Sequence, residues 1–213
     1  MKRKLLVIGA TIGLFGAVNL WWRYAARHRP LPFPAWMAWL LTLPLPRLEF
    51  GAAQILDRLD MQPGMRVLDV GSGPGRLSIP AAQRVGPAGE VVALDIQAAM
   101  LHKLQQRAAA RGISNIRTVH SPIEAGVLEP ESFDRALLVA VLGEVPDREA
   151  ALREIFAALK PGGILAVTEG LIDPHYQRRA TVVQLAEAAG FRLDGAFGGR
   201  LMYTLHFSKP PTR

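Results

Sequence analysis

The sequence predicts an α/β fold in which a mostly parallel sheet carries helices on both faces, preceded by an N-terminal membrane helix. Three observations predict it. From Gly51 onward, short apolar runs alternate with stretches whose apolar residues recur at helical spacing. A glycine-rich turn at residues 71–75 follows the first of these apolar runs, where a strand would pass into a helix. An uncharged run, residues 5–22, stands ahead of the alternating pattern.

The helices of the globular part are predicted from apolar spacing and from the residues that stop them. The first carries apolar residues at 52, 55, 56 and 59 and is stopped by Pro63 and Gly64. The others are predicted from about 76 to 84, across 100–112, across 152–159 and from 181 to 190. Asp147 is a candidate N-cap for the fourth helix. Thr181 and Gln184 form a candidate capping box for the last.

The strands are predicted as the short apolar runs between these helices. They cover residues 66–70, 91–95, 116–119, 136–141, 164–169, 192–197 and 202–208. The turn at residues 161–163, Pro-Gly-Gly, leads into the fifth strand. Because strands alternate with helices, the sheet should be parallel and covered on both faces. Residues 51–213 are therefore predicted to form one domain.

The positive charge of the chain is concentrated near its start. The 213 residues include 25 Lys and Arg against 18 Asp and Glu, a net charge of +7. Seven of the basic residues lie within residues 1–47, and the first acidic residue is Glu49, so residues 48–213 carry no net charge. A neutral domain argues against a surface that follows nucleic-acid phosphates. The absence of cysteine excludes disulfides, thiolate metal ligands and a cysteine nucleophile, and no metal site is predicted.

Residues 1–30 are predicted to be a membrane anchor. The run 5–22 would reach roughly 27 Å as a helix, close to the thickness of a bilayer core of about 30 Å. Trp21, Trp22 and Tyr24 stand where an interfacial aromatic belt would lie. A cleaved signal peptide and a buried core helix are the alternatives, although no convincing cleavage site follows the run.

Two further features belong to the same region. Gly9 and Gly13 form a GxxxG pattern, which either joins two copies in a homodimer or is filler in a short span. Residues 31–50 form a second apolar piece, bounded by prolines and too short to cross a bilayer. Trp36 and Trp39 share one face of it, as in an interfacial or lid segment that lies on lipid or packs on the domain that follows.

The glycine-rich turn carries the strongest functional signal. Its glycines let the backbone approach a ligand closely at the N-terminus of a helix. A dinucleotide fingerprint would need a glycine at position 76, which is Arg76. Asp69, two residues before the first glycine, favours a cationic group over a pyrophosphate. Asp95 ends the second predicted strand, where an acid can accept hydrogen bonds from both ribose hydroxyls. Together these features indicate a cofactor site.

The chain resembles the class I S-adenosylmethionine-dependent methyltransferases, closest to their quinone-biosynthesis and small-molecule branch. The resemblance covers about residues 55–209 and includes the segments LDVGSGPG, VVALD, FDRALLVAVLGEVPD and LKPGGILAVTE. It implies a Rossmann-like, seven-stranded sheet with an antiparallel last strand, and S-adenosyl-L-methionine as the cofactor. Within that implied site, Asp69 would lie near the methionine moiety, Asp95 would hold the ribose and Ile96 would pack on the adenine. The full implied set of cofactor contacts is Asp69, Gly71, Ser72, Gly73, Gly75, Asp95, Ile96, Ser121, Pro122 and Val139.

The acceptor side departs from the family pattern and leaves the catalytic residues open. Where related sequences often have a histidine after the fourth strand, this chain has Gly143 followed by Glu144. The weak candidates for a catalytic or acceptor-facing residue are His120, Glu144, His175 and Tyr176. Each also has a plain structural interpretation, as a strand end, a helix start or a solvated loop. Methyl transfer depends mainly on alignment of donor and acceptor, so it does not require a dedicated catalytic constellation.

The leading functional hypothesis is a membrane-anchored methyltransferase acting on a lipophilic acceptor, either a phospholipid amine headgroup or a quinone precursor. One alternative is a methyltransferase of a soluble amine, phenol or thiol, and a second is a non-catalytic membrane protein that retains the fold. Because the cofactor is cytosolic, the domain is expected on the cytoplasmic side of the cell membrane. Whether the first helix spans the bilayer or lies in it stays open, since the basic residues at positions 2–4 resist translocation.

Overall fold

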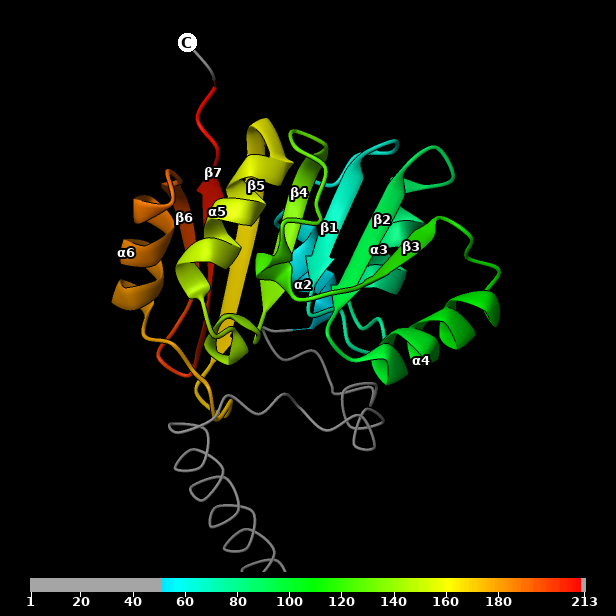
Figure 1. The fold of residues 1–213 in the computed structure, drawn as a ribbon, viewed down its shortest axis with the longest axis horizontal. Coiled ribbons are helices and arrows are strands. Elements are labelled where there is room, and N and C mark those ends of the chain that lie inside the picture. Colours follow the sequence, from blue (N-terminus) through cyan, green and yellow to red (C-terminus); the bar gives the residue numbers. More distant parts are fainter. Residues whose placement is uncertain (1–50, 212–213) are drawn as a thin grey trace, which may run out of the picture.

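Seven short segments pair side by side into one sheet, in the order β3-β2-β1-β4-β5-β7-β6. The computed structural model describes residues 51–211, whose arrangement is shown in Figure 1. The strands are β1 (Arg66–Val70), β2 (Glu90–Asp95), β3 (Ile116–His120), β4 (Phe133–Val139), β5 (Leu159–Gly170), β6 (Arg192–Gly198) and β7 (Met202–Ser208). Strands β1 to β5 run parallel, and β7 is antiparallel to both of its neighbours, β5 and β6. The predicted mostly parallel, seven-stranded sheet with an antiparallel last strand is confirmed.

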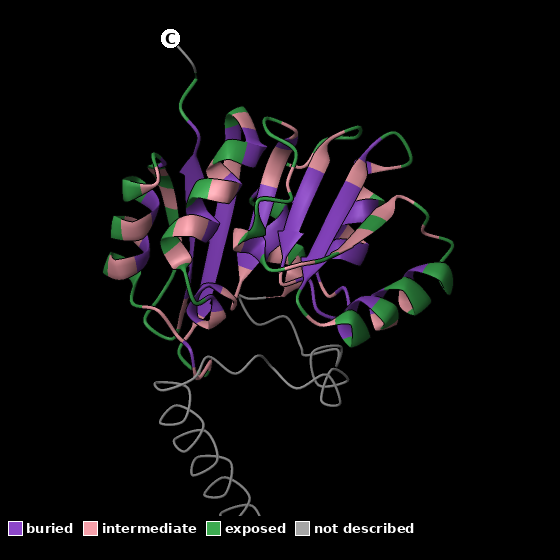
Figure 2. Ribbon diagram, viewed as in Figure 1, coloured by how far each residue is buried: buried purple, intermediate pink, exposed green. Residues whose placement is uncertain are grey.

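Helices cover both faces of this sheet. They are α2 (Ala52–Asp57), α3 (Ser78–Val85), α4 (Ala98–Ala109), α5 (Arg148–Ala158) and α6 (Arg179–Ala188). Side chains alternate along each strand, so neighbouring residues meet different helices. Val67 shares an apolar cluster with residues of α2 and α3, whereas Leu68 shares one with residues of α5 and α6. The central strands are buried on both faces, as the purple ribbon in Figure 2 shows, which explains their continuous apolar runs.

The helix boundaries test the capping predictions. Asp147 caps α5 as predicted, because its Oδ1 accepts a backbone hydrogen bond from the first turn at 2.8 Å. The predicted capping box at Thr181 is wrong. Helix α6 begins at Arg179, with Arg178 as an extended N-cap residue, so Thr181 already lies inside the first turn. No side chain caps this helix.

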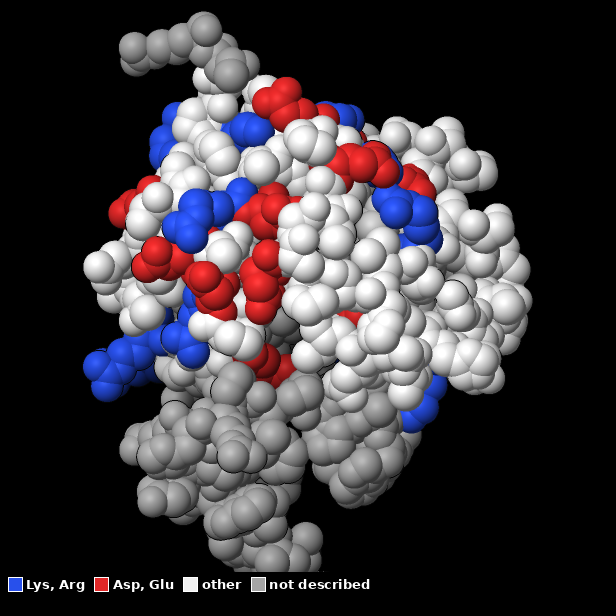
Figure 3. All heavy atoms as spheres, in the orientation of Figure 1, with Lys and Arg blue, Asp and Glu red and all other residues white. Residues whose placement is uncertain are grey.

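The two edges of the sheet differ in character. The carboxyl ends of β1, β2, β4 and β5 meet at the lower edge in Figure 1, where the loops that follow them lie. The opposite edge carries ion pairs: Arg66 Nε lies 2.6 Å from Glu90, and its Nη1 lies 2.6 Å from Glu129. Figure 3 shows acidic and basic atoms interleaved along this upper edge. Most of the residues predicted to bind ligands therefore gather at the lower edge.

The membrane predictions concern residues that precede the described part of the chain. Within residues 51–211, no helix has the length and apolar character needed to cross a bilayer. The predicted anchor at residues 1–30, its GxxxG pattern and the interfacial segment at residues 31–50 lie outside the described residues. They stay predictions.

Candidate functional site

The turn between β1 and α3 is shaped by three glycines with left-handed backbone. Gly71, Gly73 and Gly75 have φ of +66°, +53° and +82°, a region that L side chains rarely adopt. Packing adds a second requirement. A Cβ on Gly71 would lie 2.3 Å from Val141 Cγ2, and one on Gly75 would lie 2.1 Å from Leu104 Cδ1. The turn therefore lies tightly between the loop after β4 and helix α4.

Asp95 holds this turn from the end of β2. Its Oδ2 accepts from Gly73 N at 2.8 Å, and its Oδ1 accepts from Gln97 N at 2.8 Å. Burial raises the pKa of the carboxyl, and the two backbone donors act in the opposite direction. Each carboxylate oxygen has a second lone pair, so Asp95 can still accept two hydroxyl groups. The predicted ribose acid thus also positions the glycine turn.

Asp69 is fully buried at the end of β1. Its Oδ2 accepts a hydrogen bond from Ser78 Oγ, at the start of α3, at 2.5 Å. Burial raises the pKa of Asp69 to about 6, with the hydroxyl of Ser78 and the charge of Arg76 opposing the rise. The carboxylate thereby ties β1 to α3, in addition to the electrostatic role that the sequence predicts for it.

Three of the other predicted cofactor contacts, Ile96, Ser121 and Pro122, follow the adjacent strands β2 and β3. Ile96 is 50% exposed, an unusual state for an isoleucine after a buried strand and suited to packing against a planar base. Ser121 Oγ donates to the carbonyl of Pro122 at 3.0 Å, and the ring of His120 contacts the carbonyl of Ile96 at 3.0 Å. His120 therefore lies beside the residues predicted to bind the nucleoside. Val139, half-buried, ends β4.

The residues of this turn fit a nucleoside cofactor that carries a positive charge. Ser72 Oγ is buried and has no hydrogen-bond partner among the described residues, as expected for a group that awaits a polar ligand. Asp95 has acceptor capacity for ribose hydroxyls, and Ile96 offers an exposed apolar surface next to it. The buried carboxylate of Asp69 supplies negative charge near the turn. This combination suits adenosine linked to a cationic group.

A second group of polar side chains lies where β5 ends. Glu169 is 1% exposed, and its Oε2 accepts from Gln177 N at 3.1 Å. Its Oε1 is buried with no partner among the described residues, and burial raises its pKa to about 8. His175, in the loop after β5, is 8% exposed, and its Nε2 likewise has no partner among those residues. Burial lowers the pKa of His175. At neutral pH the glutamate is therefore mostly protonated, and the histidine is mostly neutral.

The acceptor-side candidates divide into those that the structure brings together and those it does not. Glu144 Oε1 lies 3.6 Å from His175 Nδ1, so these two predicted residues are neighbours. The ring of Tyr176 packs edge-on against Tyr203 at 6.1 Å between centroids, as part of the apolar core. His120 lies on the cofactor side of the glycine turn. Within the described residues, no group of three or more His, Asp or Glu is placed to hold one metal ion.

Gly143 is explained by the backbone of His175. A Cβ on Gly143 would lie 1.9 Å from the carbonyl oxygen of His175, so no larger residue fits there. The loop after β5 thus occupies the space next to Gly143. The same segment includes Ala140, whose φ of +56° is strained for a residue with a side chain. The loop after β4 therefore touches both the glycine turn, through Val141, and the acceptor loop, through Gly143.

Sequence reasoning missed Glu169. A usable signal was present, because this acid ends an apolar strand at the ligand-binding edge just as Asp95 does. What the sequence could not show is that the loop after β5 folds back over it. Tyr203 Oη donates to the carbonyl of Gln177 at 2.7 Å, which helps to hold that loop in place.

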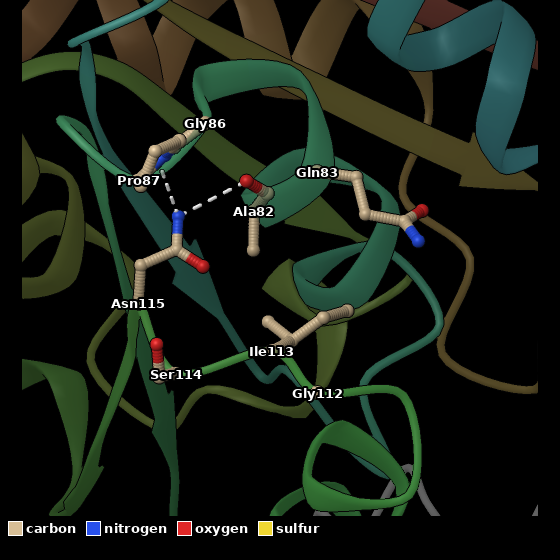
Figure 4. Close-up of a pocket in the computed structure, with 8 residues that line it drawn as sticks. All are labelled: Ala82, Gln83, Gly86, Pro87, Gly112, Ile113, Ser114 and Asn115. Carbon is tan, nitrogen blue, oxygen red and sulfur yellow. Dashed lines mark hydrogen bonds between the residues drawn. The ribbon is translucent and has the colours of Figure 1, made fainter.

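One hollow of about 220 Å³ lies away from this edge. It is lined by Ala82, Gln83, Gly86, Pro87, Gly112, Ile113, Ser114 and Asn115 (Figure 4). The Asn115 amide donates to the carbonyls of Ala82 and Gly86 at 3.0 and 2.8 Å, which ties the start of β3 to the end of α3. The Asn115 side chain of this hollow is thus engaged in joining secondary-structure elements.

The strand order, the antiparallel β7, the glycine turn and the acid that ends β2 define the class I S-adenosylmethionine-dependent methyltransferases. Residues 61–189, more than half of the chain, match the family described as "Methyltransferase domain", and the chain belongs to that family. Its methyl donor is S-adenosyl-L-methionine. A solved S-adenosylmethionine-dependent methyltransferase from Aquifex aeolicus has the same fold, with a TM-score of 0.75 and 24% identity. That match covers 83% of this chain and 99% of the other.

Curated relatives are similar over about half of the chain. Demethylmenaquinone methyltransferase of Geobacillus kaustophilus is 35% identical over 115 residues, which are 54% of this chain and 49% of the relative. The ubiquinone/menaquinone biosynthesis C-methyltransferase UbiE of Shewanella oneidensis is 40% identical over 109 residues, 51% of this chain and 43% of the relative. The chain therefore spans about half the length of the curated relatives that it matches.

Proposed function

We propose that this protein is a membrane-anchored methyltransferase that acts on a lipophilic acceptor with an ionisable ring hydroxyl, a quinone precursor being the concrete candidate. The observation that carries the proposal is that Glu169 and His175 are both buried near the end of β5 and that each has a polar atom without a partner among the described residues. The apolar run at residues 5–22 supports the membrane, and the names of the curated relatives support the quinone.

The chemistry divides between the two sides of the site. When bound, the cofactor supplies a methyl group activated by its positively charged sulfur. Asp95 would accept hydrogen bonds from the ribose hydroxyls, and Ile96 would pack on the adenine. The glycine turn would leave room for the part of the cofactor that lies against its backbone. Asp69, once ionised, stabilises positive charge at the end of β1. These residues orient the donor, which is the larger part of catalysis in an in-line displacement.

The side chains on the acceptor side would take up the proton that the acceptor releases. When a ring carbon receives the methyl group, the bond from methyl to sulfur breaks, a carbon–carbon bond forms, and the ring must release a proton. Neutral His175 can accept a proton at Nε2, and protonated Glu169 can donate a hydrogen bond from its free oxygen to the ring oxygen. A pKa of about 8 lies close to the operating pH, as suits a group that exchanges protons. A neutral amine acceptor has less need of these two side chains, since the methylated amine can lose its proton to water.

The proposed location is the cell membrane, with the domain on the cytoplasmic side where the methyl donor is available. The basic residues before the apolar run would attract the anionic surface of the bilayer. Deletion of residues 1–46 should reduce turnover of a bilayer-embedded acceptor and leave cofactor affinity unchanged. Unchanged turnover would contradict the role of the anchor.

The direct test is to incubate the protein with methyl-labelled S-adenosylmethionine and a whole membrane extract, and to identify the labelled product by mass spectrometry. Label in the isoprenoid quinone fraction is the expected result, and Asp95→Ala is the matched control that should lose it. Label in phospholipid headgroups would replace the quinone with an amine. Label only in water-soluble compounds would contradict the lipophilic acceptor, and absence of cofactor binding by calorimetry would contradict catalysis altogether.

A further inference from the structure

Exposed apolar side chains lie at the loop tips of the carboxyl edge. Ile172 is 75% exposed, Leu201 is 71% exposed and Leu171 is 40% exposed. The loop after β5 provides two of them and the turn between β6 and β7 provides the third. Leu171 N donates to the carbonyl of Leu201 at 2.7 Å, so the two loops form one surface. These three residues form the loop-tip patch.

Exposed basic side chains lie in the segments that adjoin this patch in sequence. They are Arg178, Arg179 and Arg200. Figure 3 shows basic atoms at the lower left of the view, below α6. The carboxylates of the same region are recessed, with the Glu144 and Asp173 side chains 20% and 16% exposed and Glu169 buried. This corner therefore combines three exposed apolar side chains with three exposed arginines in adjoining segments.

We infer that the loop-tip patch docks on the surface of an anionic bilayer. Its three apolar side chains would enter the interfacial region, and the arginines would meet lipid phosphates. Three points favour a bilayer as the occupant. The charge is complementary to anionic lipid. The 50 residues before the described part include the apolar run 5–22. Helix α2, where the described part begins, lies toward the same lower edge in Figure 1.

This inference deepens the proposed function and rests on it in one respect. Docking at the loop-tip patch would turn the edge that holds Glu169 and His175 toward the lipid, so that an acceptor could enter without crossing water. The docking itself has a readout that does not depend on any acceptor. The two proposals can therefore fail separately.

The absence of cysteine in the chain makes a site-specific test direct. Single cysteines placed by Ile172→Cys and Leu201→Cys in the full-length protein would carry an environment-sensitive fluorophore such as NBD. The matched control is Ser114→Cys, an exposed position before β3 at the opposite edge. The proteins are mixed with vesicles of equal parts phosphatidylcholine and phosphatidylglycerol, with and without lipids that carry a quencher in the acyl chain.

The expected result is a blue shift and quenching at positions 172 and 201 and neither effect at position 114. No change at 172 and 201 would overturn the inference. Labels that are already shielded before vesicles are added would also overturn it, because residues 1–50 of the same chain would then cover the patch. If labelled quinone forms in the extract while these labels stay in water, the docking fails and the proposed function stands.

The arginines provide a second, quantitative test. The combined substitution Arg178→Gln, Arg179→Gln and Arg200→Gln should weaken quenching-detected binding at position 172 by roughly a hundredfold, since each arginine near an anionic surface contributes about a fivefold effect. Binding to vesicles of phosphatidylcholine alone should change little. An equal loss on both kinds of vesicle would overturn the role assigned to charge.

Discussion

Glu169 and Asp69 are both carboxylic acids at the ends of buried strands, yet they titrate differently. Burial raises the pKa of Glu169 to about 8 and that of Asp69 to about 6. Asp69 accepts a hydrogen bond from the hydroxyl of Ser78, and this bond favours the charged form of Asp69. Glu169 accepts one backbone donor and has one oxygen without a partner among the described residues. One acid is therefore mostly charged at neutral pH, and the other is mostly neutral.

Glu169→Gln should stabilise the protein at alkaline pH. The native state raises the pKa of Glu169 from 4.5 to about 8. The contribution of protonated Glu169 to the free energy of unfolding is therefore fully present below pH 4.5 and is lost as the pH rises through about 8. At about 1.4 kcal/mol per pKa unit, a rise of roughly 3.5 units corresponds to a loss on the order of 5 kcal/mol. Glutamine keeps the acceptor for Gln177 and cannot ionise. Denaturant unfolding should show similar stabilities near about pH 5 and a more stable variant near about pH 9. A pH-independent difference would contradict this account.

Asp69→Asn should flatten the pH dependence of cofactor binding. With a pKa of about 6, Asp69 ionises as the pH rises from about 5 to about 7, and a carboxylate attracts the positively charged donor. We therefore expect S-adenosylmethionine affinity to rise about tenfold over that interval in the unmodified protein, the equivalent of one pKa unit. Titration calorimetry measures it directly. S-adenosylhomocysteine, which lacks the charged sulfur, is the control and should show a smaller rise.

At the scale of elements, the loop after β4 joins the two halves of the site. Val141 lies against Gly71 of the cofactor turn, and Gly143 lies against the backbone of His175 in the acceptor loop. A change at Gly143 should therefore act on the acceptor loop, whereas a change at Val141 should act on the cofactor turn.

Gly143→Ala should displace the acceptor loop. The new Cβ would lie 1.9 Å from the carbonyl of His175, and a backbone atom cannot rotate away. We expect a loss of stability of roughly 2 kcal/mol or more and a raised KM for the acceptor, with cofactor affinity little changed. Gly199→Ala is the matched control, because nothing lies within 4 Å of its Cβ position and its φ is not left-handed. Thermal unfolding and steady-state kinetics of both variants decide the point, and equal behaviour would contradict it.

The helices and strands of residues 51–211 were largely predictable from the sequence. The spacing of the apolar residues and the positions of the turn residues indicate the same boundaries there. Strands such as β1 and β7 match their predicted bounds, since apolar runs are bounded there by turn residues. The start of α6 was not predictable, because Thr181 looks like a cap in sequence and only the path of the preceding loop places the start at Arg179. The glycine turn and Asp95 follow from local spacing, whereas the pairing of Glu144 with His175 depends on two loops far apart in sequence.

At the scale of the whole molecule, charge and apolar surface are divided between parts. Residues 48–213 have equal numbers of acidic and basic residues, and the surplus of seven positive charges lies in residues 1–47. The basic character of the chain is thus better suited to an anionic bilayer than to nucleic acid.

Replacing Lys2, Arg3 and Lys4 by glutamine should weaken the binding of the full-length protein to anionic vesicles by roughly a hundredfold at low salt. The difference should shrink as added salt screens the surface charge. Cofactor affinity should be the same in both proteins, since these residues precede the described domain. Vesicle co-sedimentation at low and high ionic strength measures the first effect, and undiminished binding would contradict the assignment.

The position of β7 between β5 and β6 has a consequence for how the protein is made. During synthesis β5 and β6 both emerge before β7, yet they cannot pair with each other in the native order. The backbone donors and acceptors along that side of β5 therefore stay unpaired until Met202–Ser208 has been synthesised and pairs antiparallel with β5. A ribosome that stalls between α6 and β7 would release a chain with an open, apolar strand edge. Quality control in the cell should recognise such a fragment sooner than one truncated after β7.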